Sequence, residues 1–365
     1  MSSSNDSRTA LRPPPRLSSL TAVAWRLLRT ARTTWPDSPP LSVGRALRWW
    51  LRKLGHLHTL HDWHLDPSNP ALREMLAYRP SIVNAAVRPY IDATWPAERR
   101  LDVIAQHYRL LRGPLRFLRF APDTQIVLAR VTVDATSVDV VLDKAPWFAH
   151  EGELVLSLFK DGQRLYSLAF TLGSDSGGKF VYAGALQGAS GDDVLATYRE
   201  LTHALHGLRP RDLLFTAFCY LCEELQLLFI RAVGDERSAC RSSYFGARPV
   251  VSSYDAVWLE HDGTLNDDGF YDLAPEAKRR QDDAIPSRKR AQYRRRYAML
   301  DALRAQMQAA LAEQRAAADS APTEPQTASS PRLPHLFERR DLTAVLALVL
   351  ADFLLDFQEF LKLQV

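Results

Sequence analysis

Residues 151–188 read EGELVLSLFKDGQRLYSLAFTLGSDSGGKFVYAGALQG, and this stretch decides the fold. It holds two apolar runs, 154–159 and 165–170, on either side of Asp161-Gly162. Aspartate followed by glycine supplies the two positive-φ positions of a tight hairpin turn. The stretch therefore predicts two antiparallel strands that open a meander.

The segments around this hairpin extend the sheet and add helices to it. We predict strands over 126–133, 138–142, 180–186, 228–233, 254–259 and 269–273, and helices over 192–206 and 210–227. A strand, a helical connection and another strand form a crossover unit, which packs its helices on one face of the sheet. The predicted class is α+β, with a mixed, largely antiparallel sheet and flanking helices. The order of its elements is similar to that of the N-acetyltransferase-like fold.

Composition divides the chain of 365 residues into five segments. Residues 1–19 form a polar arm, predicted to be disordered because it has too few apolar side chains to offset the entropy of ordering. A helical region is predicted over 20–118, and the α/β core domain with a basic helix over 119–310. A linker rich in Ala, Ser, Thr and Pro follows over 311–335, and an amphipathic helix over 336–365.

The cysteine content and the lengths of the apolar runs indicate a cytoplasmic protein. Three cysteines are an odd and sparse set, which favours a reducing compartment. The sequence shows no signal peptide and no apolar run of membrane-spanning length. A basic, Trp-containing segment over 20–60 either lies in a membrane interface or docks on the core with its Trp side chains inward. We therefore expect a cytoplasmic chain that can contact the inner membrane peripherally.

Two groups of side chains have the spacing of a metal or redox site, but their surroundings favour an ordinary role. His58, His61 and Asp62 could share one helical face, yet no second cluster supplies the missing ligands, so we predict no metal site. Cys219 and Cys222 lie three apart inside a strongly apolar helix. We expect them to be buried thiols rather than a redox pair.

Five motifs, taken together, resemble one known family. They are 151–154 (EGEL), 184–188 (GALQG), 201–210 (LTHALHGLRP), 253–258 (SYDAVW) and 287–297 (SRKRAQYRRRY). In this order they are similar to the VirK/YbjX family of bacterial proteins, over roughly residues 41–303. The resemblance implies a role in virulence, in stress responses and in tolerance of antimicrobial peptides. It implies no catalytic residues, because the family's biochemical function is unknown.

The loop over 187–191 is a candidate ligand site by analogy with the acetyltransferase-like fold. In that fold a loop after a central strand offers backbone N–H groups to cofactor phosphates at a helix start, so an acyl-CoA becomes a candidate cofactor. Asp192 and Asp193 would compete with a phosphate there, and the glycine-rich pyrophosphate signature is missing. The ligand-binding candidates in this loop are Gln187, Gly188, Ser190 and Gly191.

The segment after the first predicted helix is dense in ionisable groups. His203 and His206 are candidate acids or bases, and Arg209 and Arg211 are candidate anion ligands. The alternative is a helix C-cap at Gly207, with histidine and arginine placed at the negative end of the helix dipole. The sequence favours the cap.

Glu151 and Glu153 lie two apart at a predicted strand edge, so they are expected to share one face. Paired carboxylates can do acid/base work or bind a cation, which makes both residues catalytic candidates. A solvated strand face is the simpler interpretation of the same spacing.

A run of basic residues interleaved with tyrosines is the strongest electrostatic feature. The residues are Arg288, Lys289, Arg290, Arg294, Arg295 and Arg296. Such a run can bind anionic lipid headgroups, an acidic protein surface or, less favoured, a nucleic acid. The alternative is a docking helix that packs Tyr293, Tyr297 and Leu300 on the core. Some of its arginines would then pair with acidic residues at 272, 282 and 283.

The sequence supports two functions from different classes. The first is a binding or interaction protein of the VirK/YbjX type, on the cytoplasmic side, that contacts an anionic membrane or an acidic partner. The alternative is an acyltransferase-like enzyme that binds an acyl-CoA at 187–191. The sequence alone leaves open whether the chain is an enzyme, and it leaves open the substrate and the oligomeric state.

Overall fold

The computed structural model describes residues 60, 69–134, 136–191, 194–242 and 253–320. Contacts group residues 66–324 into one compact unit, which holds the sheet and its helices. The predicted N-terminal arm, the histidines of 56–64 and the C-terminal helix over 336–365 fall outside the described residues. Among the described helices, none combines the length and the apolarity that crossing a bilayer requires.

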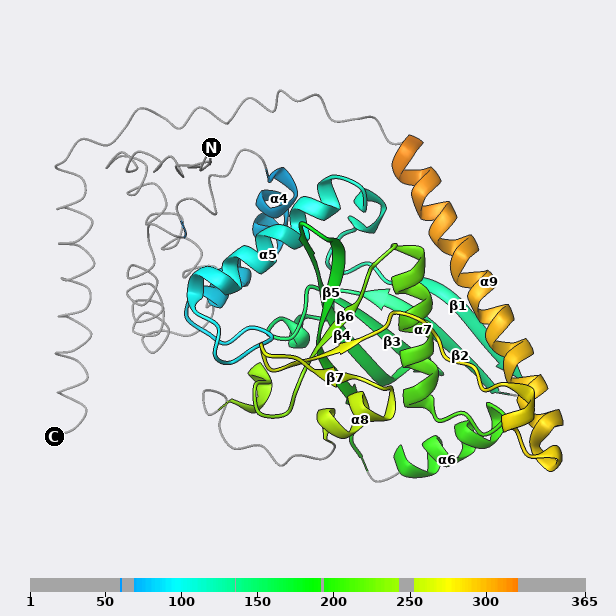
Figure 1. Ribbon diagram of the computed structural model, residues 1–365. Helices are drawn as coiled ribbons and strands as arrows, with labels where there is room; N and C mark the ends of the chain where they lie inside the picture. Colours follow the sequence, from blue (N-terminus) through cyan, green and yellow to red (C-terminus); the bar gives the residue numbers. More distant parts are fainter. Residues whose placement is uncertain (1–59, 61–68, 135, 192–193, 243–252, 321–365) are drawn as a thin grey trace, which may run out of the picture. The chain divides into compact units, whose positions relative to one another are not determined.

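One mixed sheet forms the centre of the unit (Figure 1). Its strand order is β1-β2-β3-β4-β5-β6-β8-β7. Neighbouring strands are antiparallel except β5 and β6, which are parallel. The strands are β1 Ile126–Val133, β2 Thr136–Asp143, β3 Leu154–Lys160, β4 Gln163–Asp175, β5 Gly178–Gly188, β6 Ile230–Val233, β7 Thr264–Leu265 and β8 Phe270–Leu273. The predicted meander, the crossover and the α+β class are confirmed.

Helices cover both faces of this sheet. They are α4 Pro70–Tyr78, α5 Ala97–Arg112, α6 Val194–Ala204, α7 Pro210–Glu224, α8 Tyr254–Glu260 and α9 Arg290–Ser320, with 3-10 turns that include η1 Pro80–Ala86, η2 Arg116–Leu118, η3 Pro146–Phe148, η4 Ala239–Arg241, η6 Asp282–Ala284 and η7 Ser287–Lys289. Phe170 of β4 contacts Phe218 of α7, with ring centroids 5.1 Å apart. The hydroxyl of the next residue, Thr171, accepts from the Glu153 amide at 3.2 Å, and the Glu153 carboxylate accepts from Tyr108 of α5 at 2.6 Å. Because successive strand residues point to opposite faces, α7 and α5 lie on opposite sides of the sheet.

The β3–β4 hairpin turns as its sequence predicts. Asp161 and Gly162 have φ values of 51° and 74°. Two consecutive positive φ values define the turn type whose twist matches the flanking strands. Pairing then runs from Lys160 with Gln163 to Leu154 with Phe170, which places residue 154 at the start of β3.

The long helix α9 covers the edge strand β1 (Figure 1). Its buried stripe is Leu300, Leu303, Met307 and Leu311. The side-chain oxygen of Gln306 accepts a hydrogen bond from the Arg130 amide of β1 at 2.9 Å, so one edge amide is satisfied by the helix. The helix runs to Ser320, so the first ten residues of the stretch predicted as a linker are helical.

The strand predicted over 254–259 is wrong, because these residues form α8. The hydroxyl of Ser253 caps the helix by accepting from the Ala256 amide at 3.1 Å. Tyr254, Val257 and Trp258 are buried and share the i, i+3, i+4 spacing of a helical stripe. The Trp258 ring nitrogen also donates to the Val233 carbonyl at 2.8 Å, which fixes α8 beside the end of β6.

Candidate functional site

The parallel strands β5 and β6 part soon after they meet. They pair at Val181 with Ile230, Tyr182 with Arg231 and Ala183 with Ala232. β6 ends at Val233, while β5 continues to Gly188. Beyond Ala183 the side of β5 that faced β6 is therefore open to other segments. The carboxyl ends of parallel strands are where open α/β sheets bind their ligands, so a site is expected at this place.

A cluster of polar side chains fills this place, and we call it the Glu151 cluster. Its members are Glu151, Gln187, Ser238, Cys240 and Tyr254. The Gln187 amide donates to Glu151 Oε1 at 2.7 Å and lies 3.4 Å from the Tyr254 hydroxyl. Glu151 is only 4% exposed, so its carboxylate depends on such partners. The cluster draws on four separate segments of the chain.

Cys240 is the reactive-atom candidate of the Glu151 cluster. Its thiol is half-buried on η4, 3.2 Å from the Ser238 hydroxyl. Burial first, and then the Glu151 carboxylate, raise the pKa of Cys240 to about 11. Burial also raises the pKa of Tyr254 well above its usual value. Both groups therefore keep their protons at neutral pH.

Two glycines let the segments of the Glu151 cluster approach each other. A Cβ added at Gly184 of β5 would lie 1.9 Å from the Glu151 carbonyl oxygen. A Cβ at Gly152 would lie 2.4 Å from the Phe170 amide nitrogen. Only glycine leaves room for backbone at these distances. The motifs EGEL, GALQG and SYDAVW, which lie far apart in the sequence, meet here.

A strained residue borders the Glu151 cluster. Ile91 has a φ of 57°, which is an outlier for a β-branched side chain, and it is fully buried. The Asp92 amide donates to the Tyr90 carbonyl at 2.6 Å across it, as in a tight γ-turn. Ile91 also bonds the backbone of His150 at 2.8 Å and of Ala239 at 2.9 Å. Such strain gathers at functional sites, and no sequence signal pointed to it.

Glu153 enters a different network from Glu151. It is 2% exposed and accepts hydrogen bonds from Tyr108 at 2.6 Å and Tyr90 at 3.2 Å. Burial first, and then the Glu153 charge, raise the pKa of both tyrosines well above the usual value. The expected solvated strand face is wrong, because both glutamates precede β3 and are buried. They form two separate sites rather than a carboxylate pair.

His107 of α5 lies beside the Glu153 network and carries an unsatisfied nitrogen. Its Nδ1 accepts a hydrogen bond from the Leu172 amide at 3.2 Å, so its proton is on Nε2. That Nε2 is buried without a hydrogen-bond partner among the described residues. Burial, and then the charge of Lys144, lower the pKa of His107 to about 3. The histidine is therefore neutral throughout the physiological range.

The loop over 187–191 has little free backbone to offer a phosphate. The Ala189 amide already faces the Leu165 carbonyl at 2.7 Å and the Tyr198 hydroxyl at 2.9 Å. A Cβ at Gly188 would lie 2.8 Å from that hydroxyl, so any larger residue there disturbs the fold. Ser190 and Gly191 are exposed, and Asp192 and Asp193 fall outside the described residues.

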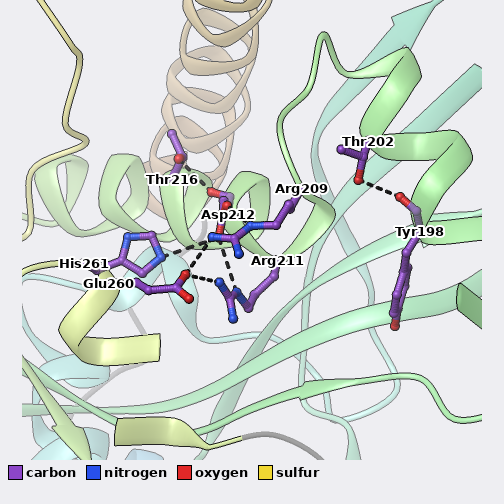
Figure 2. A network of polar contacts seen from close by, with 8 residues as sticks. All are labelled: Tyr198, Thr202, Arg209, Arg211, Asp212, Thr216, Glu260 and His261. Carbon is purple, nitrogen blue, oxygen red and sulfur yellow. Dashed lines mark hydrogen bonds and ion pairs between the residues drawn. The ribbon is translucent and has the colours of Figure 1, made fainter. Parts of the chain in front are cut away.

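The two arginines proposed as anion ligands have carboxylate partners (Figure 2). Arg209 contacts Glu260 at 2.7 Å and Asp212 at 2.6 Å, and Arg211 contacts the same two carboxylates. Two positive and two negative charges balance within the network. The ring of His261 adds a contact of 3.8 Å to Asp212. The network ties the start of α7 to the end of α8.

The two histidines of the same segment lie at the end of α6. His203 is exposed, and His206 has a φ of 55°. The Gly207 amide reaches back to the Thr202 carbonyl at 2.7 Å, which is the geometry of a helix cap. The His206 carbonyl accepts a hydrogen bond from Arg296 of α9 at 2.8 Å. The structure thus places both histidines at a helix end, away from the Glu151 cluster's hydrogen bonds.

Four exposed cations at the start of α9 form a surface that we call the basic end of α9. They are Arg288, Lys289, Arg294 and Arg295. Within the part of the chain that the structure describes, none of the four makes an ion pair. The other two residues of the run contact neighbouring groups: Arg290 Nε donates to the Ile285 carbonyl at 3.4 Å, and the Arg296 guanidinium lies 4.3 Å from the centre of the Tyr293 ring.

Two other arginines near or on α9 are paired with carboxylates. Arg304 pairs with Glu223 at 2.6 Å, and Arg279 pairs with Asp301. Asp272, an expected partner of the basic run, pairs with Arg231 at 3.1 Å instead. The unpaired charge on this helix is therefore concentrated at the basic end of α9.

The two cysteines of α7 are buried, as predicted. Burial raises the pKa of Cys219 to about 12 and that of Cys222 well above the usual value. Among the described residues, no three His, Cys, Asp or Glu side chains gather as a metal ion would require. No sequence pattern singled out Cys240, Ser238 or the two tyrosines on Glu153, although Tyr254 lies in one of the family motifs.

Comparison with known proteins agrees with the family resemblance. A family model described as "Protein of unknown function (DUF535)" matches residues 42–309. The uncharacterized protein YbjX of Escherichia coli (strain K12) is 29% identical over 273 residues, 71% of this chain and 77% of that protein. An uncharacterized protein of Haemophilus influenzae (strain ATCC 51907 / DSM 11121 / KW20 / Rd) is 28% identical over 226 residues, 60% of this chain and 73% of the relative. No solved structure matches the chain.

Proposed function

The chain belongs to the DUF535 family of proteins of unknown function, the VirK/YbjX family, and we propose that it binds the anionic surface of a membrane through the basic end of α9. The observation that supports this proposal is the set of four exposed cations that make no ion pair within the described residues. On this proposal the chain acts at the cytoplasmic face of the inner membrane. Its role would then be in stress or virulence physiology, including tolerance of antimicrobial peptides.

The position of these cations supports binding rather than a structural role. They occupy the 3-10 turn before α9 and its first turns, and the first turn of α9 has no acidic residue. Cations at the positive end of a helix dipole destabilise the helix. A phosphate-rich surface would offset that repulsion, because it brings negative charge to the same end.

The size of the effect follows from the number of charges. Each Lys or Arg near an anionic membrane surface contributes about 1 kcal/mol. Four such residues would contribute about 4 kcal/mol, or roughly a thousandfold in affinity. Replacing Arg294 and Arg295 together with glutamate removes two of these contributions and adds repulsion.

Vesicle co-sedimentation tests the proposal. The protein should bind vesicles that contain phosphatidylglycerol, not vesicles of phosphatidylcholine alone, and salt should weaken the binding. Arg294→Glu with Arg295→Glu should weaken it by roughly thirtyfold or more. Arg130→Glu with Lys160→Glu is the matched control, because those residues are paired and lie on the sheet. If the α9 variant binds these vesicles as tightly as the native protein does, the proposal of membrane binding is rejected. If the native protein instead binds an acidic protein in the absence of vesicles, the partner is a protein.

A second candidate function, acyl-CoA binding by an acyltransferase-like enzyme, draws support from the sheet. A meander followed by a parallel pair that parts after Ala183 is similar to the acetyltransferase-like fold. The occupied Ala189 amide weakens the phosphate part of this proposal. The Glu151 cluster at the parting of the strands supplies polar groups for the acyl end of such a ligand.

A thermal-shift titration with acetyl-CoA, a long-chain acyl-CoA and coenzyme A tests the second candidate. Ligand that binds the folded state raises the melting temperature by mass action. Ser190→Glu is the test variant, because Ser190 is exposed and the substitution adds charge without crowding. The shift should be lost in Ser190→Glu and kept in Lys160→Glu. No shift with any of the three ligands would reject acyl-CoA binding.

A further inference from the structure

We propose that two copies of this chain associate through the outer faces of their α9 helices. The two helices lie side by side and antiparallel, so the basic end of one helix lies beside carboxylates near the end of the other. The partner that this surface fits is therefore a second copy of the chain. The inference goes beyond membrane binding and does not depend on it.

The outer face of α9 is exposed along most of the helix. Between residues 291 and 316 one line of exposed residues recurs at alternating steps of four and three, and all but Arg295 are alanine. We call this line the alanine face. Seen down the helix axis, it lies opposite the buried side chains Leu300, Leu303, Met307 and Leu311. It therefore points away from the sheet, and no other described element covers it (Figure 1).

The spacing of the alanine face suits a second helix. Alternating steps of four and three average 3.5 residues, the repeat that keeps one side of a helix against a partner over many turns. Small side chains also let two helix axes approach to the short end of the usual 8–10 Å range. An exposed helix face is ordinarily charged or polar, and this one is neither along most of its length.

The charges that border the alanine face differ in sign between its two ends. Arg294 and Arg295 are exposed at the start of α9, and Glu313 and Asp319 are exposed near its end. Within the described part of the chain, Glu313 makes no ion pair, and neither does Arg295. Antiparallel packing brings opposite charges together at both ends of the contact. Parallel packing would instead place two basic ends against each other, which repels.

One antiparallel register keeps alanine against alanine. It sets Ala298 of one copy opposite Ala309 of the other, and Ala302 opposite Ala305. A two-fold axis then passes between the helices near their middle, so each contact occurs twice, as in an isologous dimer.

The same register brings charges of opposite sign together. It sets Arg288 of one copy opposite Asp319 of the other, and Arg295 beside Glu313. A cavity of about 290 Å³ opens beside Asp319, and its lining includes Phe117. An arginine of the second copy can therefore enter next to the Asp319 carboxylate.

Groups already present at this end of α9 are compatible with the contact. Asp319 contacts Arg116 within one copy, and a carboxylate has further acceptor positions for a second guanidinium. Arg315 lies opposite Arg294 in this register, but its guanidinium is 3.8 Å from the Glu224 carboxylate. The positive charge of Arg315 is thus already partnered.

The size of the alanine face predicts a weak dimer. A helical segment from 291 to 316 is about 38 Å long, and at a width of about 10 Å it covers roughly 400 Å² on each copy. The pair would bury roughly 800 Å², the size of weak and transient complexes. The dissociation constant should therefore be on the order of tens of micromolar.

Sedimentation velocity of the full chain over a wide range of concentration tests the association. The native chain should shift from monomer to dimer as its concentration rises. Ala305→Glu places two carboxylates close to the two-fold axis and should raise the dissociation constant roughly tenfold or more. Ala196→Glu is the matched control, because it makes the same change at an exposed position of α6.

An exchange of charges tests the register. Arg295→Glu alone and Glu313→Arg alone should each weaken the dimer, and the two changes in one chain should restore it. The two positions lie roughly 27 Å apart along a single helix, so they cannot contact each other within one copy. Restored association therefore reports a contact between copies, and its absence would overturn the register.

Disulfide formation between two variants tests the orientation. Ala298→Cys and Ala309→Cys, each with Cys240→Ser, should form a mixed disulfide dimer when combined, because an antiparallel pair places these positions opposite each other. Linkage of like with like would overturn the antiparallel arrangement.

Two outcomes overturn the proposal as a whole. The first is a native chain that stays monomeric at every concentration, and the second is a dimer that Ala305→Glu leaves unchanged. Ala305→Glu keeps the four cations of the basic end of α9, so its vesicle binding distinguishes failure of the dimer from failure of membrane binding.

Discussion

Replacing Glu151 with glutamine should raise the rate at which Cys240 reacts with an alkylating reagent. The carboxylate raises the pKa of the thiol, so its removal should speed reactions that need a preformed thiolate.

The raised pKa of Cys240 sets the size of this effect. The pKa of Cys240 is raised from an ordinary 9.0 to about 11, so the thiolate fraction at neutral pH falls about a hundredfold. A more basic thiolate is the stronger nucleophile, and a Brønsted coefficient of about 0.5 returns roughly tenfold. Native Cys240 should therefore react with iodoacetamide about tenfold more slowly than an unperturbed thiol.

The variant should recover only part of that tenfold. Burial is the largest cause of the raised pKa, and it remains when Glu151 becomes glutamine. The assay is the rate of iodoacetamide addition to Cys240, followed by peptide mass spectrometry between pH 7 and 9, with Cys219 as the buried reference. An alkylation rate that falls in the variant, or a wild-type rate equal to that of a free thiol, would refute the reasoning.

Three further changes test the buried networks. Glu153→Ala should destabilise the fold by about 3 kcal/mol or more in urea melts, because two buried tyrosine hydroxyls lose their acceptor; a loss below about 1 kcal/mol would contradict this. The pKa of His107 is about 3 in the folded state and about 6.5 in the unfolded state. Below pH 6.5 the unfolded state therefore binds more protons, and the free energy of unfolding should fall by about 2 kcal/mol at pH 5. His107→Gln should reduce this dependence of the free energy of unfolding on pH. Gly184→Ala should cost about 3 kcal/mol or more, because its Cβ would overlap the Glu151 carbonyl, whereas Gly113→Ala makes an ordinary contact and should be nearly neutral.

The sheet could be predicted from the sequence wherever local chemistry decides the backbone. Asp161-Gly162 fixes the hairpin, because few other residues accept two positive φ values. The crossover from β5 to β6 follows from apolar periods that change from strand to helix. The error at 254–259 has a local cause as well. Seven residues hold too few periods to separate a strand from a helix, and the cap at Ser253 is the signal that distinguishes them.

The candidate site could be predicted only in part, because its surroundings come from distant segments. Spacing placed Glu151 and Glu153 on one face, but both lie in the turn before β3, where alternation does not hold. The burial of Glu153 depends on Tyr90 and Tyr108, which lie 63 and 45 residues away. Cys240 gains its neighbours in the same way, through contacts that no local pattern encodes.

The docking of α9 against β1 has a consequence for how the chain survives in a crowded cell. An uncovered edge strand is a template on which other strands can grow into aggregates. Here a single helix of 31 residues shields that edge, and Gln306 occupies one of its amides. Proteolytic loss of α9 would therefore do more than remove the basic end. It would expose β1 as an unpaired edge strand, on which the strands of other chains could pair into fibrous aggregates.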